Sequence, residues 1–208
     1  MTTTFLLVPG AGGAAWYWHR VVPELRRRGY GAVAVGLPAT DPAAGLAAYA
    51  DAVVAAAEDA DDVVLVAQSM GGLTVPLVVA RLPVRLVVAL NAMIPAPGET
   101  GGDWWANTGH AVAPADEVFL HDVPAQVLAT SPGEPEQSTR PFEDPSPGWP
   151  DVETVVLVGR DDRFFPPDFQ RRVAADRLGL AVQEIPGGHL AALSRPVELA
   201  ERLTTLAA

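Results

Sequence analysis

One serine stands in a setting that would make its hydroxyl reactive. Ser69 follows the apolar run VVLVA (63–67) and precedes a segment with helical character. A sharp turn from a buried strand into a helix raises a serine hydroxyl above the sheet, as in a nucleophile elbow. Small residues are needed two positions to either side, because larger side chains collide at such a strained turn. Gly71 satisfies this requirement and Ala67 is a mild departure. The pattern predicts a nucleophilic serine, against the alternative of a serine that only caps a helix.

A serine hydroxyl becomes a good nucleophile only when a base accepts its proton. Four histidines are available, and His189 lies in the glycine-flanked loop IPGGHL (185–190) between the last apolar run and the last helical segment. His19 falls in the first helical segment, while His110 and His121 fall in a long region without strands, where we expect structural, exposed or substrate-contacting roles. The sequence therefore predicts His189 as the base, against the alternative of a surface loop histidine.

An acid that orients the imidazole is expected after a strand that lies between the serine and the histidine in the chain. The apolar run TVVLV (154–158) leads into Gly-Arg-Asp-Asp, which offers Asp161 and Asp162. We predict that Asp162 is the acid and that Asp161 is a solvated turn residue. Some triads place the acid after an earlier strand, but Asn91 stands there in this chain.

Acyl transfer places negative charge on an oxygen, which needs two preorganised donors. The backbone N–H of Met70, directly after the serine, is one candidate because it lies at a helix start. The other is expected from the loop PGAGGAAW (9–16), whose glycines allow the backbone to approach a substrate closely. This loop does not follow the G-x-G-x-x-G pattern of dinucleotide sites, and no acidic ribose partner closes the unit. We therefore expect no nucleotide cofactor.

The elements that would position these residues alternate along the chain. Six apolar runs, mostly without polar alternation, predict strands buried on both faces, which is typical of a parallel sheet covered by helices. These runs are residues 5–8, 32–35, 63–67, 85–90, 154–158 and 180–185. Helices are expected over residues 18–28, 43–60, 71–81, 167–178 and 196–206. The alternation predicts a single α/β domain over residues 1–208, with a doubly wound, mostly parallel sheet.

Residues 91–150 interrupt this alternation with no clear strand. Short helices are expected over 115–120 and 124–129, and the Pro- and Gly-crowded residues 132–150 are expected to form an irregular or mobile loop. Long insertions in compact domains are usually functional. We therefore predict a short, Pro-rich cap over the carboxyl ends of the strands, with a plain connecting loop as the alternative.

Large apolar side chains near the predicted site are candidate walls of a substrate pocket. Trp104 and Trp105 lie in the insertion, Met93 lies at its start, and Trp16 lies near the oxyanion loop. Aromatic residues of a cap more often only pack against one another, and that alternative stays open.

The composition limits the classes of function. The 208 residues are enough for one well-buried domain. A net charge of -11 argues against nucleic-acid or anionic-membrane binding, because a basic surface is missing. The absence of cysteine excludes disulfides and thiolate ligands, and we expect no metal. No basic leader precedes the first apolar run, and no stretch approaches the roughly 18 apolar residues of a membrane span. A cytoplasmic location is expected.

Together these motifs resemble the α/β-hydrolase superfamily, particularly the small esterase group that includes plant methyl-ester esterases and hydroxynitrile lyases. The resemblance is carried by PGAGGAAWYWHRVVPELRRRGY (9–30), AQSMGG (67–72), FLHDVP (119–124), GRDDRFFPPDFQRR (159–172) and GGHLAAL (187–193). It implies Asp162 as the acid, His189 as the base and the N–H of Ala11 as the second oxyanion donor. It also implies hydrolysis of a small carboxylic ester or lactone through an acyl-serine intermediate, without a cofactor.

Two departures from the family pattern affect the substrate site. Pro9 stands where the oxyanion loop usually begins with histidine, and the insertion is shorter than the usual helical cap. A hydroxynitrile lyase would carry lysine at Leu190 and threonine at Ala11, so both positions favour an esterase. A non-catalytic small-molecule binding protein on the same scaffold is a third possibility. The sequence leaves a homodimer open.

Overall fold

The computed structural model describes residues 2–58, 60–110, 118–133 and 136–208. In this part of the chain six parallel strands form one sheet in the order β2-β1-β3-β4-β5-β6. The strands are β1 (Thr4–Val8), β2 (Gly31–Ala34), β3 (Val63–Gln68), β4 (Val84–Leu90), β5 (Thr154–Gly159) and β6 (Val182–Ile185). Each apolar run that predicted a strand forms one, and the predicted α/β class is confirmed.

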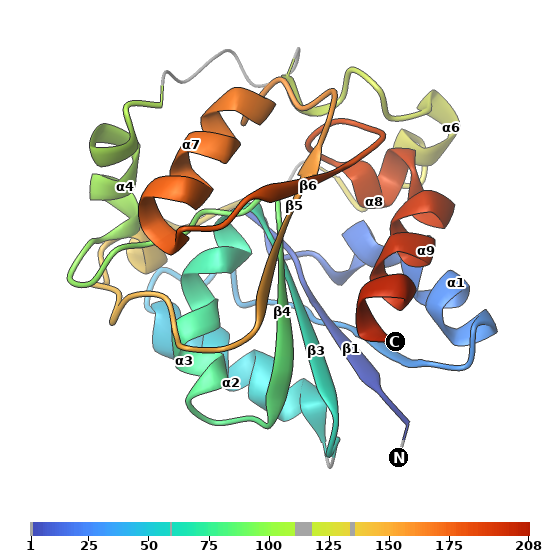
Figure 1. Cartoon of the computed structure of the whole chain (residues 1–208), viewed down its shortest axis with the longest axis horizontal. Coiled ribbons are helices and arrows are strands. Elements are labelled where there is room, and N and C mark those ends of the chain that lie inside the picture. The colour runs from blue at the N-terminus through green and yellow to red at the C-terminus, as the bar shows by residue number, and fades with distance from the viewer. Residues whose placement is uncertain (1, 59, 111–117, 134–135) are drawn as a thin grey trace.

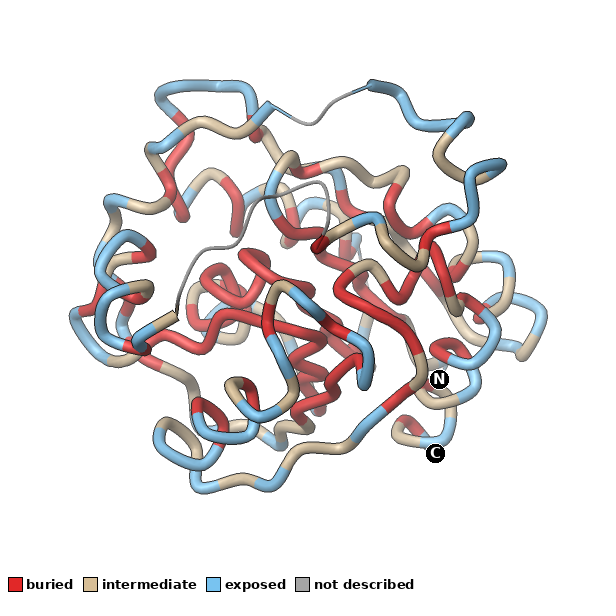
Figure 2. The backbone as a smooth tube through the Cα atoms, turned by 90° about the horizontal axis from the view of Figure 1, so that it is seen from above, coloured by how far each residue is buried: buried red, intermediate tan, exposed pale blue. Residues whose placement is uncertain are grey.

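Helices cover both faces of the sheet (Figure 1). On β1, Phe5 and Leu7 pack on the face covered by η1, α1, α8 and α9, whereas Leu6 and Val8 pack on the face covered by α2 and α3. The bounds of these elements are η1 (Ala15–Trp18), α1 (Val21–Arg27), α2 (Leu46–Ala57), α3 (Val75–Val79), α8 (Ala191–Ser194) and α9 (Pro196–Ala207). Seen from above, the buried segments run through the middle and the exposed ones around the rim (Figure 2).

The helix expected over residues 71–81 is shorter than predicted. The chain after β3 first forms a 3₁₀ helix, η2 (Ser69–Thr74), and only then α3 (Val75–Val79). Two adjacent glycines are poor helix formers, and Pro76 suits only a first turn, so the regular helix starts after them. By contrast, α7 (Pro167–Leu178) has the predicted bounds, with Pro167 in its first turn.

The insertion between β4 and β5 holds α4 (Gly101–Thr108), α6 (Ala125–Leu128) and η3 (Arg140–Phe142). The predicted helix over 124–129 is present as α6. Residues 115–117 of the one predicted over 115–120 lie outside the described residues, and residues 118–119 are helical. In Figure 1 the insertion lies along the edge where the strands end.

One ion pair and one hydrogen bond anchor the insertion to the rest of the domain. Glu99 binds Arg177 of α7 through two hydrogen bonds of 2.7 and 2.9 Å. Asp144 binds Arg140 at 2.5 Å and also accepts the N–H of Leu46 at the start of α2.

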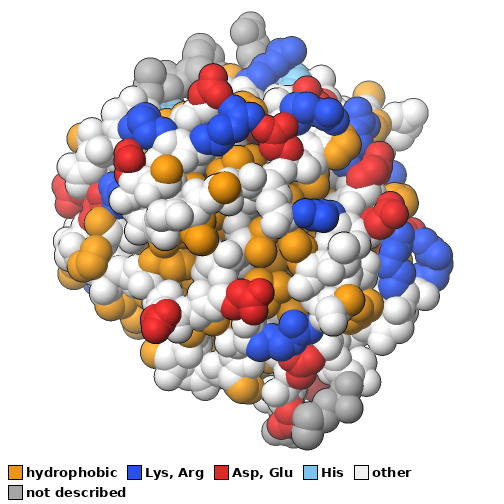
Figure 3. All heavy atoms as spheres, in the orientation of Figure 1, with side chains coloured by type: hydrophobic (Ala, Val, Ile, Leu, Met, Phe, Trp, Pro, Cys, Tyr) orange, Lys and Arg blue, Asp and Glu red, His pale blue; other side chains and the backbone are white. Residues whose placement is uncertain are grey.

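The outer surface is mixed in charge. On the face shown in Figure 3, acidic and basic side chains are interspersed, with hydrophobic atoms scattered between them. None of the helices within the described ranges combines the length and the apolar character that crossing a membrane requires.

Candidate active site

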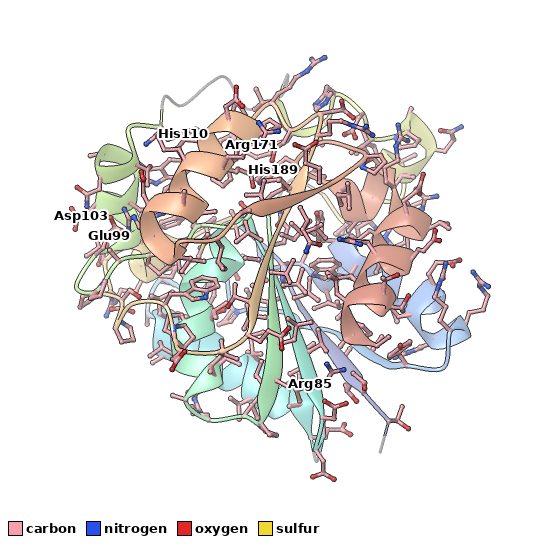
Figure 4. The ribbon with its side chains drawn as sticks, viewed as in Figure 1. Arg85, Glu99, Asp103, His110, Arg171 and His189 are labelled. Atoms are coloured by element: carbon pink, nitrogen blue, oxygen red, sulfur yellow. The ribbon has the colours of Figure 1, made fainter. Side chains whose placement is uncertain are left out.

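The loops after β3, β5 and β6 converge at one edge of the sheet, because parallel strands end on the same side. They bring together Ser69, Asp162 and His189. The Ser69 Oγ lies 2.9 Å from His189 Nε2, and His189 Nδ1 lies 2.8 Å from Asp162 Oδ2. The three residues are buried, with exposures of 8%, 3% and 1% in chain order. Figure 4 shows His189 above the strand ends.

Ser69 has the backbone conformation of a tight elbow. Its φ is 52°, a strained value for a residue with a side chain. The flanking backbone allows this turn because glycines stand at the close contacts. A Cβ at Gly71 would lie 2.7 Å from the Pro9 carbonyl oxygen, and one at Gly10 would lie 2.8 Å from Ser69 Cβ. The loop that follows β1 therefore lies directly against Ser69.

Both carboxylate oxygens of Asp162 accept hydrogen bonds. Its Oδ1 accepts the N–H groups of Phe164 and Phe165 at 2.8 and 2.9 Å, and its Oδ2 accepts from His189 and from Gln170 Nε2 at 3.3 Å. Such a carboxylate keeps the imidazole proton on Nδ1, which leaves Nε2 free to accept the serine proton. Asp161 is exposed and accepts the N–H of Gly187, so the geometry distinguishes the two aspartates.

The loop that carries His189 is held on the side of the sheet by three side chains. The sequence did not indicate these as site residues. The carbonyl oxygen of His189 accepts hydrogen bonds from Asn91 Nδ2 at 3.1 Å, Gln68 Nε2 at 3.3 Å and the Tyr17 hydroxyl at 3.5 Å. Asn91 Oδ1 in turn accepts the N–H of Gly159 at the end of β5. Burial raises the pKa of Tyr17 far above its ordinary value, so its hydroxyl stays a neutral donor.

The loop predicted to supply an oxyanion donor is held by backbone and amide contacts, where the family pattern has a histidine. Gly12 donates its N–H to Gln137 Oε1 at 3.0 Å, and the Gly13 carbonyl accepts the N–H of Leu37 at 2.8 Å. Within the described residues, no protein acceptor binds the N–H of Ala11. The N–H of Met70 belongs to the first turn of η2, where backbone donors have no partner within the helix. Both donors therefore remain available to a substrate oxygen.

A cavity of about 740 Å³ opens beside these loops. Apolar groups form most of its wall, and the polar members are Tyr17, Thr40, Gln68, Ser131 and Glu136. Its lining includes Gly10, Ala11, Trp16, Leu120, Leu128, Leu190 and Leu193. Among the four predicted pocket residues, Trp16 lies at this cavity.

The other three predicted pocket residues lie elsewhere: Met93 and Trp104 are in the hydrophobic core, and Trp105 is partly buried against it. Trp104 is fully buried and donates its indole N–H to the Ile94 carbonyl at 3.1 Å. Met93 is buried behind Gly72. Trp105 packs at 5.9 Å between ring centroids against Phe164. Sequence alone could not tell which side of the insertion these side chains face, because that depends on how α4 docks on α7.

The remaining histidines do not join the serine. His19 is exposed and stacks on Trp16, His110 contacts the Phe164 carbonyl at 2.6 Å, and His121 contacts the Val118 carbonyl at 3.2 Å. Figure 4 shows His110 apart from His189. Across the described ranges, no group of three or more His, Asp or Glu side chains is arranged to hold a metal ion.

Known proteins share this arrangement of elements. Residues 5–202 match the model of the Alpha/beta hydrolase family. The chain is 29% identical to a probable esterase, PIR7A, of Oryza sativa subsp. indica, over 98% of this chain and 96% of the relative. A solved pyrethroid hydrolase from Sphingobium faniae JZ-2 is 25% identical with a TM-score of 0.82, over 100% of this chain and 98% of that one. The methylesterase MES16 from Arabidopsis has the same fold, with 18% identity and a TM-score of 0.79, over 100% and 99% of the two chains.

These matches confirm the resemblance that the motifs indicated. Since the family model spans nearly all of the sequence, the chain belongs to the alpha/beta hydrolase family.

Proposed function

We propose that this protein is a serine esterase that cleaves a small carboxylic ester or lactone through an acyl-serine intermediate. The observation that carries the proposal is the 2.9 Å contact between Ser69 Oγ and His189 Nε2, made at a strained turn and backed by a buried aspartate. Relatives that bear the names esterase and pyrethroid hydrolase support the reaction class.

In the proposed reaction, Ser69 Oγ attacks the ester carbonyl carbon while His189 Nε2 takes the hydroxyl proton. The carbonyl oxygen gains negative charge and accepts the N–H groups of Ala11 and Met70. The tetrahedral intermediate collapses as His189 returns the proton to the departing alcohol oxygen. Water, deprotonated by the same imidazole, then attacks the acyl carbon, and the imidazolium returns the proton to Ser69 Oγ as the acid leaves. Asp162 stabilises the imidazolium in both steps.

The cavity favours an ester with an apolar portion. Its volume of about 740 Å³ and its lining by Trp16, Leu128, Leu190 and Leu193 suit a hydrophobic group of drug-like size. Leu190 also places an aliphatic side chain where a hydroxynitrile lyase would carry a lysine ammonium. The esterase is therefore favoured over the lyase, and cleavage of mandelonitrile would reverse that preference.

Replacement of the serine tests the proposal. Ser69→Ala is expected to lower turnover of p-nitrophenyl butyrate at least about 10⁴-fold, because the nucleophile is lost. It should also abolish covalent labelling by a fluorophosphonate, which the wild type undergoes. A Ser69→Ala protein that hydrolyses the ester at the wild-type rate would refute the mechanism. A wild type that binds esters without turnover or labelling would instead indicate a binding protein.

A further inference from the structure

The insertion touches the loop of His189 directly. Phe119 packs with its ring 5.3 Å from the His189 ring, at an interplanar angle of 65°. Three residues further on, Asp122 Oδ2 accepts the N–H of Gly188 at 2.7 Å. This bond joins residues 66 positions apart in the chain. Gly188 directly precedes His189, so the bond fixes the Gly187–Gly188 peptide, one residue before the imidazole-bearing residue.

A side chain at position 188 would force His121 and Asp122 to move. A Cβ at Gly188 would lie 2.6 Å from His121 Cε1 and 2.9 Å from Asp122 Oδ1. Gly188 does not have a positive φ, so its backbone conformation alone does not call for glycine. The space is taken up by the insertion instead.

Two buried polar atoms at this junction have no partner of their own among the described residues, His121 Nε2 and Asp122 Oδ1. Unpaired buried acceptors cost free energy. Residues 119–122 therefore do not form a complete hydrogen-bond network among themselves. They are held at this junction by the bond from Gly188 to Asp122 and by packing.

We propose that Asp122 is a positioning residue, which holds the imidazole of His189 in line with Ser69 by accepting the Gly188 N–H. The inference rests on the proposed function. Asn91 and Gln68 hold the carbonyl oxygen of His189 from the side of the sheet, and Asp122 holds the preceding N–H from the side of the insertion. The loop is thereby held on both sides of His189, through the carbonyl oxygen of the His189–Leu190 peptide and through the N–H of the Gly187–Gly188 peptide.

Removal of the acceptor should therefore affect turnover more than binding. In Asp122→Ala, kcat for p-nitrophenyl butyrate is expected to fall about 10- to 100-fold, since misplacement of a catalytic group by about 1 Å has effects of that size. KM should change less than about threefold, because Asp122 does not line the cavity. Asp122→Asn keeps an oxygen that can accept the Gly188 N–H, and its kcat should stay within about threefold of wild type.

Asp144→Ala is the matched control. Asp144 also belongs to the insertion, and its carboxylate accepts a backbone N–H of the core at the same distance of 2.7 Å, but at the start of α2. This variant is expected to lose stability while kcat per active site, counted by fluorophosphonate titration, stays at the wild-type value.

A second variant keeps the test decisive if Asp122→Ala does not fold. Gly188→Ala should displace Asp122 and reduce kcat similarly, and the double variant should lose little more than either single one. Wild-type kcat in folded Asp122→Ala or Gly188→Ala, or an equal loss in Asp122→Asn, would overturn the inference. Ser69→Ala, assayed in parallel, tests the proposed function separately: if it stays active, that function fails whatever the Asp122 variants do.

Discussion

The space around the proposed nucleophile leaves no room for a side chain at position 10. A Cβ at Gly10 would lie 2.5 Å from Gln68 Oε1 and 2.8 Å from Ser69 Cβ. Ser69 is already in a strained conformation and has no easy alternative. We therefore expect Gly10→Ala to lower kcat/KM for p-nitrophenyl butyrate about 100-fold. The rate of fluorophosphonate labelling should fall in parallel.

Gly36→Ala is the control for that change. Gly36 also follows a strand, has no positive φ, and an added Cβ would meet nothing within 4 Å. Its kcat/KM should be unchanged, and its free energy of unfolding should be equal or higher by about 0.4–1 kcal/mol. If Gly10→Ala reacts as fast as Gly36→Ala, the close approach of the loop to the serine has no catalytic importance.

The meeting of Ser69, Asp162 and His189 could be predicted because each has a local signature. A buried run precedes the serine and the aspartate, and glycines flank the histidine. Asn91 and Gln170 could not be assigned in this way. In the sequence Asn91 stands only where some triads have an acid, yet its amide links the ends of β4 and β5 to the histidine loop. Such roles depend on which strands become neighbours, and no local pattern encodes that.

The proposed oxyanion loop, residues 9–16, depends on the insertion for part of its support. Gln137 accepts the Gly12 N–H with its Oε1 and donates its Nε2 to the Tyr49 hydroxyl at 2.9 Å, which links the loop to α2. Gln137→Ala removes this link and should let the loop relax. We expect kcat/KM to fall about tenfold, mostly in kcat, because a misaligned donor weakens stabilisation of the transition state more than substrate binding. Steady-state kinetics on p-nitrophenyl butyrate measures this.

Gln126→Ala supplies the comparison for Gln137→Ala. Gln126 is an exposed residue of α6 in the same insertion, and its replacement should change neither kcat nor KM. Equal kinetics for the two variants would show that the Gln137 link does not support the oxyanion loop.

Strands were more predictable than helices in this chain, for a physical reason. A parallel strand is buried on both faces, so its whole run is apolar and its limits are visible. The first and last residues of a helix depend both on local helix propensity and on contacts with distant segments. The expected helix over 18–28 forms as η1 and α1, and the one over 43–60 starts only at Leu46, where Asp144 of the distant insertion accepts its N–H. Long-range contacts of this kind set the ends of elements without leaving a local signal.

Three carboxylate side chains of the insertion hold it to separate elements of the domain. Glu99 contacts α7, Asp144 contacts α2 and Asp122 contacts the loop after β6. The first of these is the most buried, with side-chain exposures of 3% for Glu99 and 16% for Arg177. The fixed placement of the insertion over the strand ends is therefore expected to depend on pH.

Burial opposes the ionisation of Glu99, but hydrogen bonds from Arg177, Ala96 and Asn107 hold the pKa of Glu99 below its ordinary value. A lowered pKa in the folded state means that this pair stabilises the fold fully above the unfolded-state pKa of about 4.3 and loses that effect as the pH falls through the folded-state pKa. In Arg177→Met the carboxylate stays buried without its cation. The folded-state pKa of Glu99 should then rise, and the variant should be less stable by about 3 kcal/mol at pH 8.

The sign of the pH dependence distinguishes this ion pair from ordinary packing. As the pH falls from 8 to 5, Glu99 in Arg177→Met can take up a proton, so the stability difference from wild type should shrink. Urea unfolding of both proteins across this range measures the difference, in which the other carboxylates cancel. Arg81→Met removes an exposed pair with Asp51, with side-chain exposures of 44% and 67%, and should cost less than about 1 kcal/mol at every pH. A difference between wild type and Arg177→Met that stays constant with pH would mean that Arg177 acts through its aliphatic packing, and that charge does not hold the insertion to α7.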